Sequence, residues 1–157
     1  MENVLLARVD DRLIHGQVMT AWMKTYPATQ IVIVDDEVAK DSFMINVLTM
    51  AAPTGVKVRV FGAEKAAQLL KKGVKNPTIL LAKTPITYAR LIEAGVELTA
   101  INLGGMGISG ERTTLYKNLA ASPAEREAIK EMLTKGIDIK IQVIPADKSI
   151  DVAEVLS

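Results

Sequence analysis

The chain contains no cysteine and a single histidine, His15. The absence of cysteine excludes a disulfide framework, thiol chemistry and a thiolate metal site, and one histidine supplies too few nitrogen ligands for a zinc site. Lysine and arginine number 19 against 18 aspartates and glutamates, so the net charge of +1 gives no basis for electrostatic binding to nucleic acid or acidic lipid. No apolar run approaches the roughly 20 residues that span a bilayer, and Met1-Glu2-Asn3 lacks the basic start of a signal peptide. We therefore expect a cytoplasmic protein that does not bind nucleic acid.

The composition is otherwise that of an ordinary soluble protein, with 157 residues of which 49% are hydrophobic and 24% charged. A chain of this length buries a sizeable core as one domain. We find no internal repeat, low-complexity segment or linker, and we expect residues 1–157 to form a single domain.

Short apolar runs rich in β-branched residues alternate with segments of helical period. We expect strands at 4–9, 31–34, 56–61, 78–81, 99–103 and 137–144. Counting N-caps, we expect helices at 16–25, 41–50, 63–72, 84–94, 122–135 and 150–156. The clearest helix start is Ser122-Pro123-Ala124-Glu125, a capping box with proline in the first turn. Residues 113–121 are ambiguous, and we favour a strand in their second half.

This alternation predicts an α/β fold, a doubly wound and mainly parallel central sheet with helices on both faces. Right-handed crossovers place the loops that follow the strands along one edge, where such sheets bind ligands. The polar residues that follow the strands are therefore the candidate functional residues.

The first strand ends in the segment Arg8-Val9-Asp10-Asp11-Arg12-Leu13-Ile14-His15, which is dense in charged side chains. An imidazole is a good nucleophile toward phosphorus, and the P–N bond that it forms stays reactive enough to pass the phosphoryl group on. Phosphoryl transfer needs little beyond alignment and positive charge at the phosphate oxygens. Arg12 and His15 are spaced to share one side of a turn, and Arg8 at the strand end could reach the same oxygens. The segment predicts that His15 is a transient phosphoryl carrier assisted by both arginines.

The hypothesis also assigns roles to the residues next to His15. Asp10 or Asp11 would hold the ring N–H that does not react and so fix the tautomer. Main-chain N–H groups around Gly16 and Gln17, where a helix begins, would complete an anion-binding cradle. The alternative is a surface histidine among exposed ion pairs of little consequence.

Two further strand ends carry candidate residues. Gly105-Met106-Gly107-Ile108-Ser109-Gly110 matches the dinucleotide pattern G-x-G-x-x-G, but neither an apolar helical face nor an acidic residue at the required offset follows it. We expect a tight loop at the edge of the site there, and no nicotinamide site. Lys83 and Thr84 follow the fourth strand on the expected ligand edge, and Thr84 also fits as a helix N-cap. A phospho-acceptor receiver domain is excluded because the third strand ends in Val60-Phe61-Gly62, without an acceptor aspartate.

Asp35-Asp36-Glu37 is an acidic cluster after the second strand. Three adjacent carboxylates usually form a solvated loop, and no nucleotide site accompanies them that would share a magnesium ion. We therefore expect neither a metal nor a cofactor.

The segment from Arg8 to Val18, with Asp10-Asp11-Arg12 and His15-Gly16-Gln17 inside it, resembles the active-site signature of the IIB component of the mannose/fructose/sorbose class of the bacterial sugar phosphotransferase system. Further segments resemble that family in the same order, namely 35–41, 50–53, 83–85, 93–96, 101–106 and 136–145. The resemblance covers essentially the whole chain. The run 115–122 is more similar to amino-sugar (N-acetylgalactosamine-type) members than to mannose members.

The resemblance implies that His15 accepts a phosphoryl group from a phosphohistidine of the IIA protein and donates it to a sugar held by the membrane components IIC and IID. Such a chain is a protein-Npi-phosphohistidine–sugar phosphotransferase that meets the membrane only through its partners. The family's active-site arginine corresponds to Arg12, and Arg8 corresponds to a second basic position. The resemblance implies no metal or nucleotide.

A non-catalytic module of the same architecture, whose loop senses a small anion and signals to a partner, is the alternative from a different functional class. The residues also leave open the sugar, the reacting ring nitrogen, and whether the chain forms a homo-oligomer.

Overall fold

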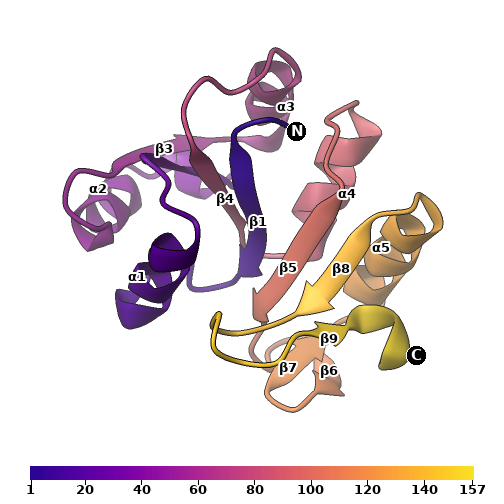
Figure 1. The fold of residues 1–157 in the computed structure, drawn as a ribbon. Helices are drawn as coiled ribbons and strands as arrows, with labels where there is room; N and C mark the ends of the chain where they lie inside the picture. The colour runs from indigo at the N-terminus through magenta and orange to yellow at the C-terminus, as the bar shows by residue number, and fades with distance from the viewer.

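A seven-stranded sheet runs through the centre of the computed structural model, which describes residues 1–157 (Figure 1). All neighbouring strands are parallel except the edge strand β9, which is antiparallel to β8. In spatial order the strands are β3 (Lys57–Phe61), β2 (Gln30–Val34), β4 (Thr78–Ala82), β1 (Val4–Asp10), β5 (Ala100–Gly105), β8 (Asp138–Ile141) and β9 (Ile150–Asp151). The predicted doubly wound, mainly parallel α/β fold is confirmed.

Helices cover both faces of the sheet because each strand sends alternate apolar side chains to opposite sides. Ile31 and Ile33 of β2 belong to one core, and Val32 and Val34 belong to the other. The first core is covered by two helices, α1 (Gly16–Thr25) and α2 (Ser42–Ala51). The second, larger core is covered by three helices, α3 (Ala63–Lys71), α4 (Pro85–Glu93) and α5 (Pro123–Thr134). No helix is long and apolar enough to cross a membrane.

The carboxyl end of β1 lies where the winding of the sheet changes direction. The chain leaves β1 for α1 on one face, whereas it leaves the neighbouring strand β4 for α4 on the other face (Figure 1). Loops that diverge to opposite faces open a crevice at the strand ends, and open α/β sheets bind ligands there. The fold thus places residues 11–15, which join β1 to α1, at the expected ligand edge.

Three segments differ from the sequence-based expectations. Residues 113–121 form a hairpin of β6 (Thr113–Tyr116) and β7 (Leu119–Ala121), so both halves are strands, joined by a turn in which Lys117 has φ +50°. The helix expected at 150–156 is wrong, because residues 150 and 151 pair with β8 as β9 and only the 3-10 turn η2 (Val152–Glu154) follows. Another 3-10 turn, η1 (Val38–Lys40), precedes α2.

Arg112, in the loop after β5, ties that loop to the start of α5. Glu125 closes the predicted capping box with Ser122, and its two oxygens also accept from Arg112 Nε and Nη2, each at 2.9 Å. The Thr84 hydroxyl donates to the same carboxylate at 2.6 Å. Burial acts to raise the pKa of Glu125, but the hydrogen bonds from Arg112, Thr84 and Ser122 outweigh it and lower the pKa. The Glu125 carboxylate therefore joins the loops after β4 and β5 to α5.

We predict that Glu125→Gln lowers the free energy of unfolding by about 1–3 kcal/mol near neutral pH, because a buried, charge-assisted set of hydrogen bonds is weakened. A carboxyl whose pKa is lowered by folding stabilises the fold above its unfolded pKa, and this stabilisation is lost as the pH falls through the folded value. The difference from wild type should therefore shrink below about pH 4. Urea unfolding at several pH values measures both effects. Glu127→Gln, an exposed change on the same helix, is the control, and an equal loss in both variants would contradict the prediction.

Candidate functional site

The side chain of Asp10, the last residue of β1, is the centre of the site. Its Oδ2 lies 2.8 Å from His15 Nε2 and 3.1 Å from Arg8 Nη2, and its Oδ1 accepts from the Arg12 main-chain N–H at 3.0 Å. Only 1% of Asp10 is exposed. Because a carboxylate can only accept, His15 donates its Nε2–H to Asp10. The sequence left Asp10 and Asp11 as alternatives for this contact, and the structure places Asp10 there.

His15 stands at the N-cap position of α1 with an extended backbone. No side chain caps this helix, and its first turn has no acidic residue. No protein group is hydrogen-bonded to the other ring nitrogen, Nδ1, and 18% of the side chain remains exposed. Two left-handed residues flank this position, Leu13 at φ +60° before His15 and Gly16 at φ +43° directly after it. The structure therefore presents an oriented imidazole, with one unbonded nitrogen, beside uncapped helical N–H groups.

Arg8 does not lie where the sequence suggested. It is 1% exposed, and its guanidinium donates to Asn102 Oδ1 at 2.7 Å, to the Gln142 carbonyl at 3.1 Å and to Asp10. The guanidinium also lies 5.3 Å from the centre of the Trp22 ring. Burial lowers the pKa of Arg8, and the charge of Asp10 opposes that shift. The expectation that Arg8 reaches a phosphate is wrong, because its donors are turned inward. Arg8 is instead the buried ion-pair partner of Asp10.

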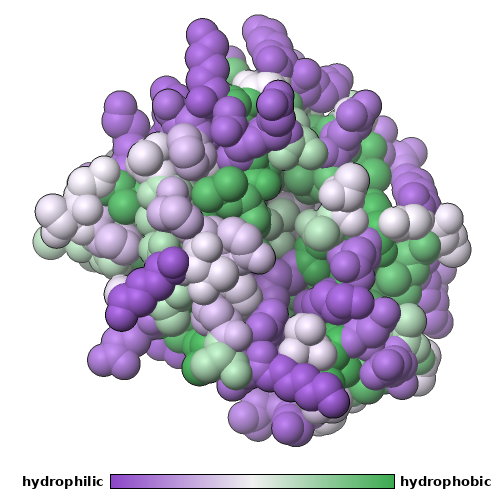
Figure 2. Space-filling model, viewed as in Figure 1, coloured by the Kyte–Doolittle hydropathy of each residue, from purple (hydrophilic) through white to green (hydrophobic).

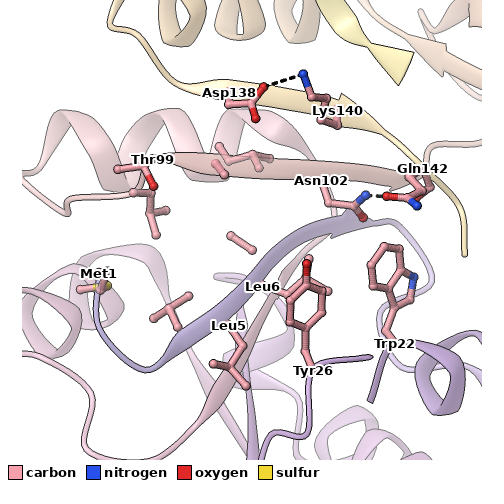
Figure 3. Close-up of a pocket in the computed structure, with 15 residues that line it drawn as sticks. Met1, Leu5, Leu6, Trp22, Tyr26, Thr99, Asn102, Asp138, Lys140 and Gln142 are labelled. Carbon is pink, nitrogen blue, oxygen red and sulfur yellow. Dashed lines mark hydrogen bonds and ion pairs between the residues drawn. The ribbon is translucent and has the colours of Figure 1, made fainter. Parts of the chain in front are cut away.

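Three residues around Arg8 also line a hollow on one face of the sheet (Figure 3). Trp22, Asn102 and Gln142 come together at one end of a hollow of about 280 Å³ on the sheet face over β1, β5 and β8. The Trp22 indole donates to the Val143 carbonyl at 2.9 Å, and Asn102 donates to the Gln142 carbonyl at 3.1 Å. These bonds fasten the segment after β8 to the back of the site.

The glycine-rich segment after β5 makes room for the buried ion pair. A Cβ at Gly104 would overlap the Arg8 guanidinium, and a Cβ at Gly105 would lie 2.6 Å from Asp10 Oδ1. Among the three glycines of the dinucleotide pattern, packing therefore explains only Gly105. A Cβ would meet nothing closer than 3.7 Å at Gly107 and nothing within 4 Å at Gly110.

Asp11 holds that loop in place and does not contact the imidazole. Its Oδ2 accepts from the Gly107 N–H and from Arg112 Nη1, both at 2.8 Å. The hydrogen bond to Glu125 is the main cause that raises the pKa of Arg112; burial opposes it, and the charge of Glu125 and the contact with Asp11 add to it. Asp11 thus joins the end of β1 to the loop after β5.

The remaining predicted site residues are either exposed to solvent or bonded within the fold. Arg12 and Gln17 are exposed, and the Arg12 guanidinium has no protein partner. Lys83 Nζ lies 3.9 Å from Asp35 Oδ2, at the same edge of the sheet. Thr84 caps α4 and donates to Glu125, so its hydroxyl is committed to the fold.

In the acidic cluster after β2, Asp35 and Asp36 accept hydrogen bonds from main-chain N–H groups. Asp35 Oδ1 accepts from the N–H groups of Glu37 and Val38 at 3.0 and 2.9 Å. The Ala63 N–H and Arg90 lower the pKa of Asp36, which accepts from both. Asp35 therefore caps the turn that follows it, and Asp36 binds the first N–H of α3, 27 residues away.

The sequence analysis missed the residues that support the site from other elements. Trp22 lies 7 positions after His15, whereas Asn102 and Arg112 lie 94 and 104 positions after Arg8. No short-range pattern connects these residues with His15 or Arg8. The adjacent pair Gly104-Gly105 was the available signal, because two glycines at a strand end indicate that another group approaches closely.

Comparisons with known proteins agree on one family. The family described as "PTS system sorbose subfamily IIB component" matches residues 4–157. The chain is 32% identical over 160 residues to the PTS system fructose-specific EIIB component of Bacillus subtilis, covering 99% of this chain and 97% of that protein. It is 34% identical over 154 residues to the PTS system mannose-specific EIIAB component of Escherichia coli, covering 97% of this chain but only 48% of that longer protein.

Solved structures agree as well. The crystal structure of manxB from Thermoanaerobacter tengcongensis superposes with a TM-score of 0.88 at 42% identity, covering 97% of this chain and 93% of that chain. The IIBSor domain of the sorbose permease from Klebsiella pneumoniae superposes with a TM-score of 0.90 at 32% identity, covering 96% of this chain and 94% of that chain. The chain therefore belongs to the IIB components of the sorbose subfamily of the phosphotransferase system.

Proposed function

We propose that His15 carries the phosphoryl group that a IIB component passes from a IIA protein to a sugar during uptake. The observation that supports this most directly is the 2.8 Å contact between Asp10 Oδ2 and His15 Nε2. This contact fixes the ring, leaves Nδ1 unbonded, and places a buried carboxylate where positive charge develops when the ring attacks phosphorus.

The transfer exchanges one P–N bond for another. The lone pair of His15 Nδ1 attacks the phosphorus of a protonated phosphohistidine on the donor. As the new P–N bond forms, the old one breaks and its electron pair stays on the donor nitrogen. The positive charge therefore moves from the donor ring to the His15 ring, where the Nε2–H directs it toward Asp10. Because both partners are imidazoles, alignment and charge determine the rate.

The phosphoryl oxygens find donors next to His15. A phosphate on the N-cap residue lies beside the first N–H groups of α1, at Gly16 and Gln17, which no side chain caps. The unpartnered guanidinium of Arg12 supplies the mobile positive charge. Phosphorylated His15 thereby becomes the cap that its own helix lacks.

The partners follow from the place of a IIB component in the system. The donor is a phosphorylated IIA protein, and the acceptor is a sugar held by the membrane components IIC and IID. The activity that we propose is that of a protein-Npi-phosphohistidine–sugar phosphotransferase. The chain acts at the cytoplasmic side, and residues 1–157 form one IIB domain. The relatives named above include both a separate EIIB protein and a fused EIIAB protein, so either arrangement of the donor fits this chain.

We predict that His15→Ala abolishes phosphorylation by phosphoenolpyruvate, the general phosphotransferase proteins and a IIA protein, because the chain has no second histidine. Acid-labile, base-stable label measured by mass spectrometry is the readout, and circular dichroism checks that the fold is intact. Label that persists in the variant, on any residue, would contradict the proposal.

We predict that Arg12→Ala slows the transfer on the order of 10²-fold, through loss of charge at the phosphate oxygens. Its free energy of unfolding should stay within about 0.5 kcal/mol of wild type, because the exposed guanidinium has no protein partner. Single-turnover transfer from phosphorylated IIA and urea unfolding measure the two quantities.

Arg8→Met is the matched variant for this comparison. Removing the buried partner of Asp10 should lower the free energy of unfolding by about 3–5 kcal/mol. If both arginine variants lost stability equally, or if Arg12→Ala transferred at the wild-type rate, the division of roles between the two arginines would be wrong.

A further inference from the structure

The outer face of α2 is apolar, which is unusual for a helix on the surface of a protein. Phe43 is 74% exposed, Val47 43% and Met50 85%, and their spacing of four and three residues puts them on one side of the helix. Met44 flanks them at 36%. We call Phe43, Val47 and Met50 the α2 stripe. In Figure 2 the surface over α2, at the left of the view, is pale to green, whereas much of the remaining rim is purple.

The stripe is not needed to hold α2 on the sheet. The opposite side of the helix buries Leu48, with Ile45 packed against the same core. A surface helix needs one apolar face for its own core and normally presents polar residues to water. A second apolar face, with contiguous exposed side chains, is a mark of an interaction surface.

The stripe begins at the edge of the sheet that carries His15. Phe43 and Met44 are in the first turn of α2, and they line a shallow hollow together with Lys83, which follows β4. β4 is hydrogen-bonded to β1, which ends at Asp10. The first turn of the stripe thus lies at the same edge of the sheet as His15, with the end of β4 between them.

The remaining exposed large apolar side chains lie on the loops after other strands. Ile108 follows β5 and is 72% exposed, and Val143 follows β8 and is 40% exposed. Ile108 and Val143 thus lie at the carboxyl edge of the sheet on one side of β1, and Phe43, at the start of α2, lies at that edge on the other side. Met50, in the last turn of α2, lies toward the opposite edge.

We infer that the α2 stripe docks the phosphorylated IIA protein. This inference rests on the proposed function, because transfer between two imidazoles brings the donor's surface against the His15 edge. Reacting atoms must be held about 3–3.5 Å apart and in line, so the donor needs anchors outside the reacting groups. A few apolar anchors give a transient interface that still releases its partner after transfer. Methionine adds a side chain that adapts to its partner's surface.

The test compares a protein donor with a small donor. The triple variant Phe43→Gln, Val47→Gln and Met50→Gln removes the stripe, and Asn46→Gln, at an exposed position on the same helix, is the control. The protein donor is the phosphorylated IIA protein of the His15→Ala experiment. The small donor is phosphoramidate, whose P–N bond breaks as the bond to His15 forms, with ammonia as the leaving group.

We expect the triple variant to raise the KM for phosphorylated IIA about tenfold or more, with kcat and labelling by phosphoramidate unchanged. The control should behave as wild type with both donors. An unchanged KM would overturn the inference and leave the proposed function standing. A loss of labelling with both donors would also overturn it, by placing the stripe in the architecture of the His15 site. If light scattering showed a wild-type dimer that the triple variant loses while IIA transfer stays normal, the stripe would be an interface between copies of this chain. Failure of both donors to label wild-type His15 would instead refute the proposed function.

Discussion

The Asp10 carboxylate is the interaction on which the site depends. It is buried, and it binds a guanidinium, an imidazole and a main-chain N–H at the same time. Burying a carboxylate without hydrogen-bond partners costs free energy, and the three contacts together offset that cost. The same carboxylate fixes the loop after β1, orients His15 and keeps the charge of Arg8 inside the protein. The Asp10 carboxylate therefore both stabilises the fold and orients the imidazole.

The surrounding elements are shaped to admit this ion pair. The two glycines that end β5 leave space for Arg8 and Asp10, and the Asn102 side chain and the Gln142 carbonyl accept from Arg8 Nη1. The Tyr88 hydroxyl, from α4, donates to the Arg8 carbonyl at 2.9 Å. Because these contacts come from the opposite face and the neighbouring strands, the site is built into the sheet, and a mobile loop alone would not position His15 as firmly.

Local sequence patterns predicted most of the fold and singled out the histidine that we propose reacts, whereas contacts between residues distant in the sequence could not be predicted. The β-branched run of β2 and the capping box at Ser122 are short-range signals, and the structure agrees with both. Charge density singled out the loop of His15. Whether Arg8 points outward or inward depends on Asn102, 94 residues away, and no local pattern contains that pairing. β9 was missed for the same reason, since its strand form depends on pairing with β8.

The identity of the phosphorylated ring nitrogen tests the role of Asp10 most directly. NMR of the phosphorylated chain with ¹⁵N-labelled histidine gives one set of ring signals, because the chain has a single histidine. We predict phosphorus bonded to Nδ1, with Nε2 still protonated and hydrogen-bonded to Asp10. Phosphorus bonded to Nε2 would contradict this arrangement, because it requires the contact between the imidazole and the buried carboxylate to be broken.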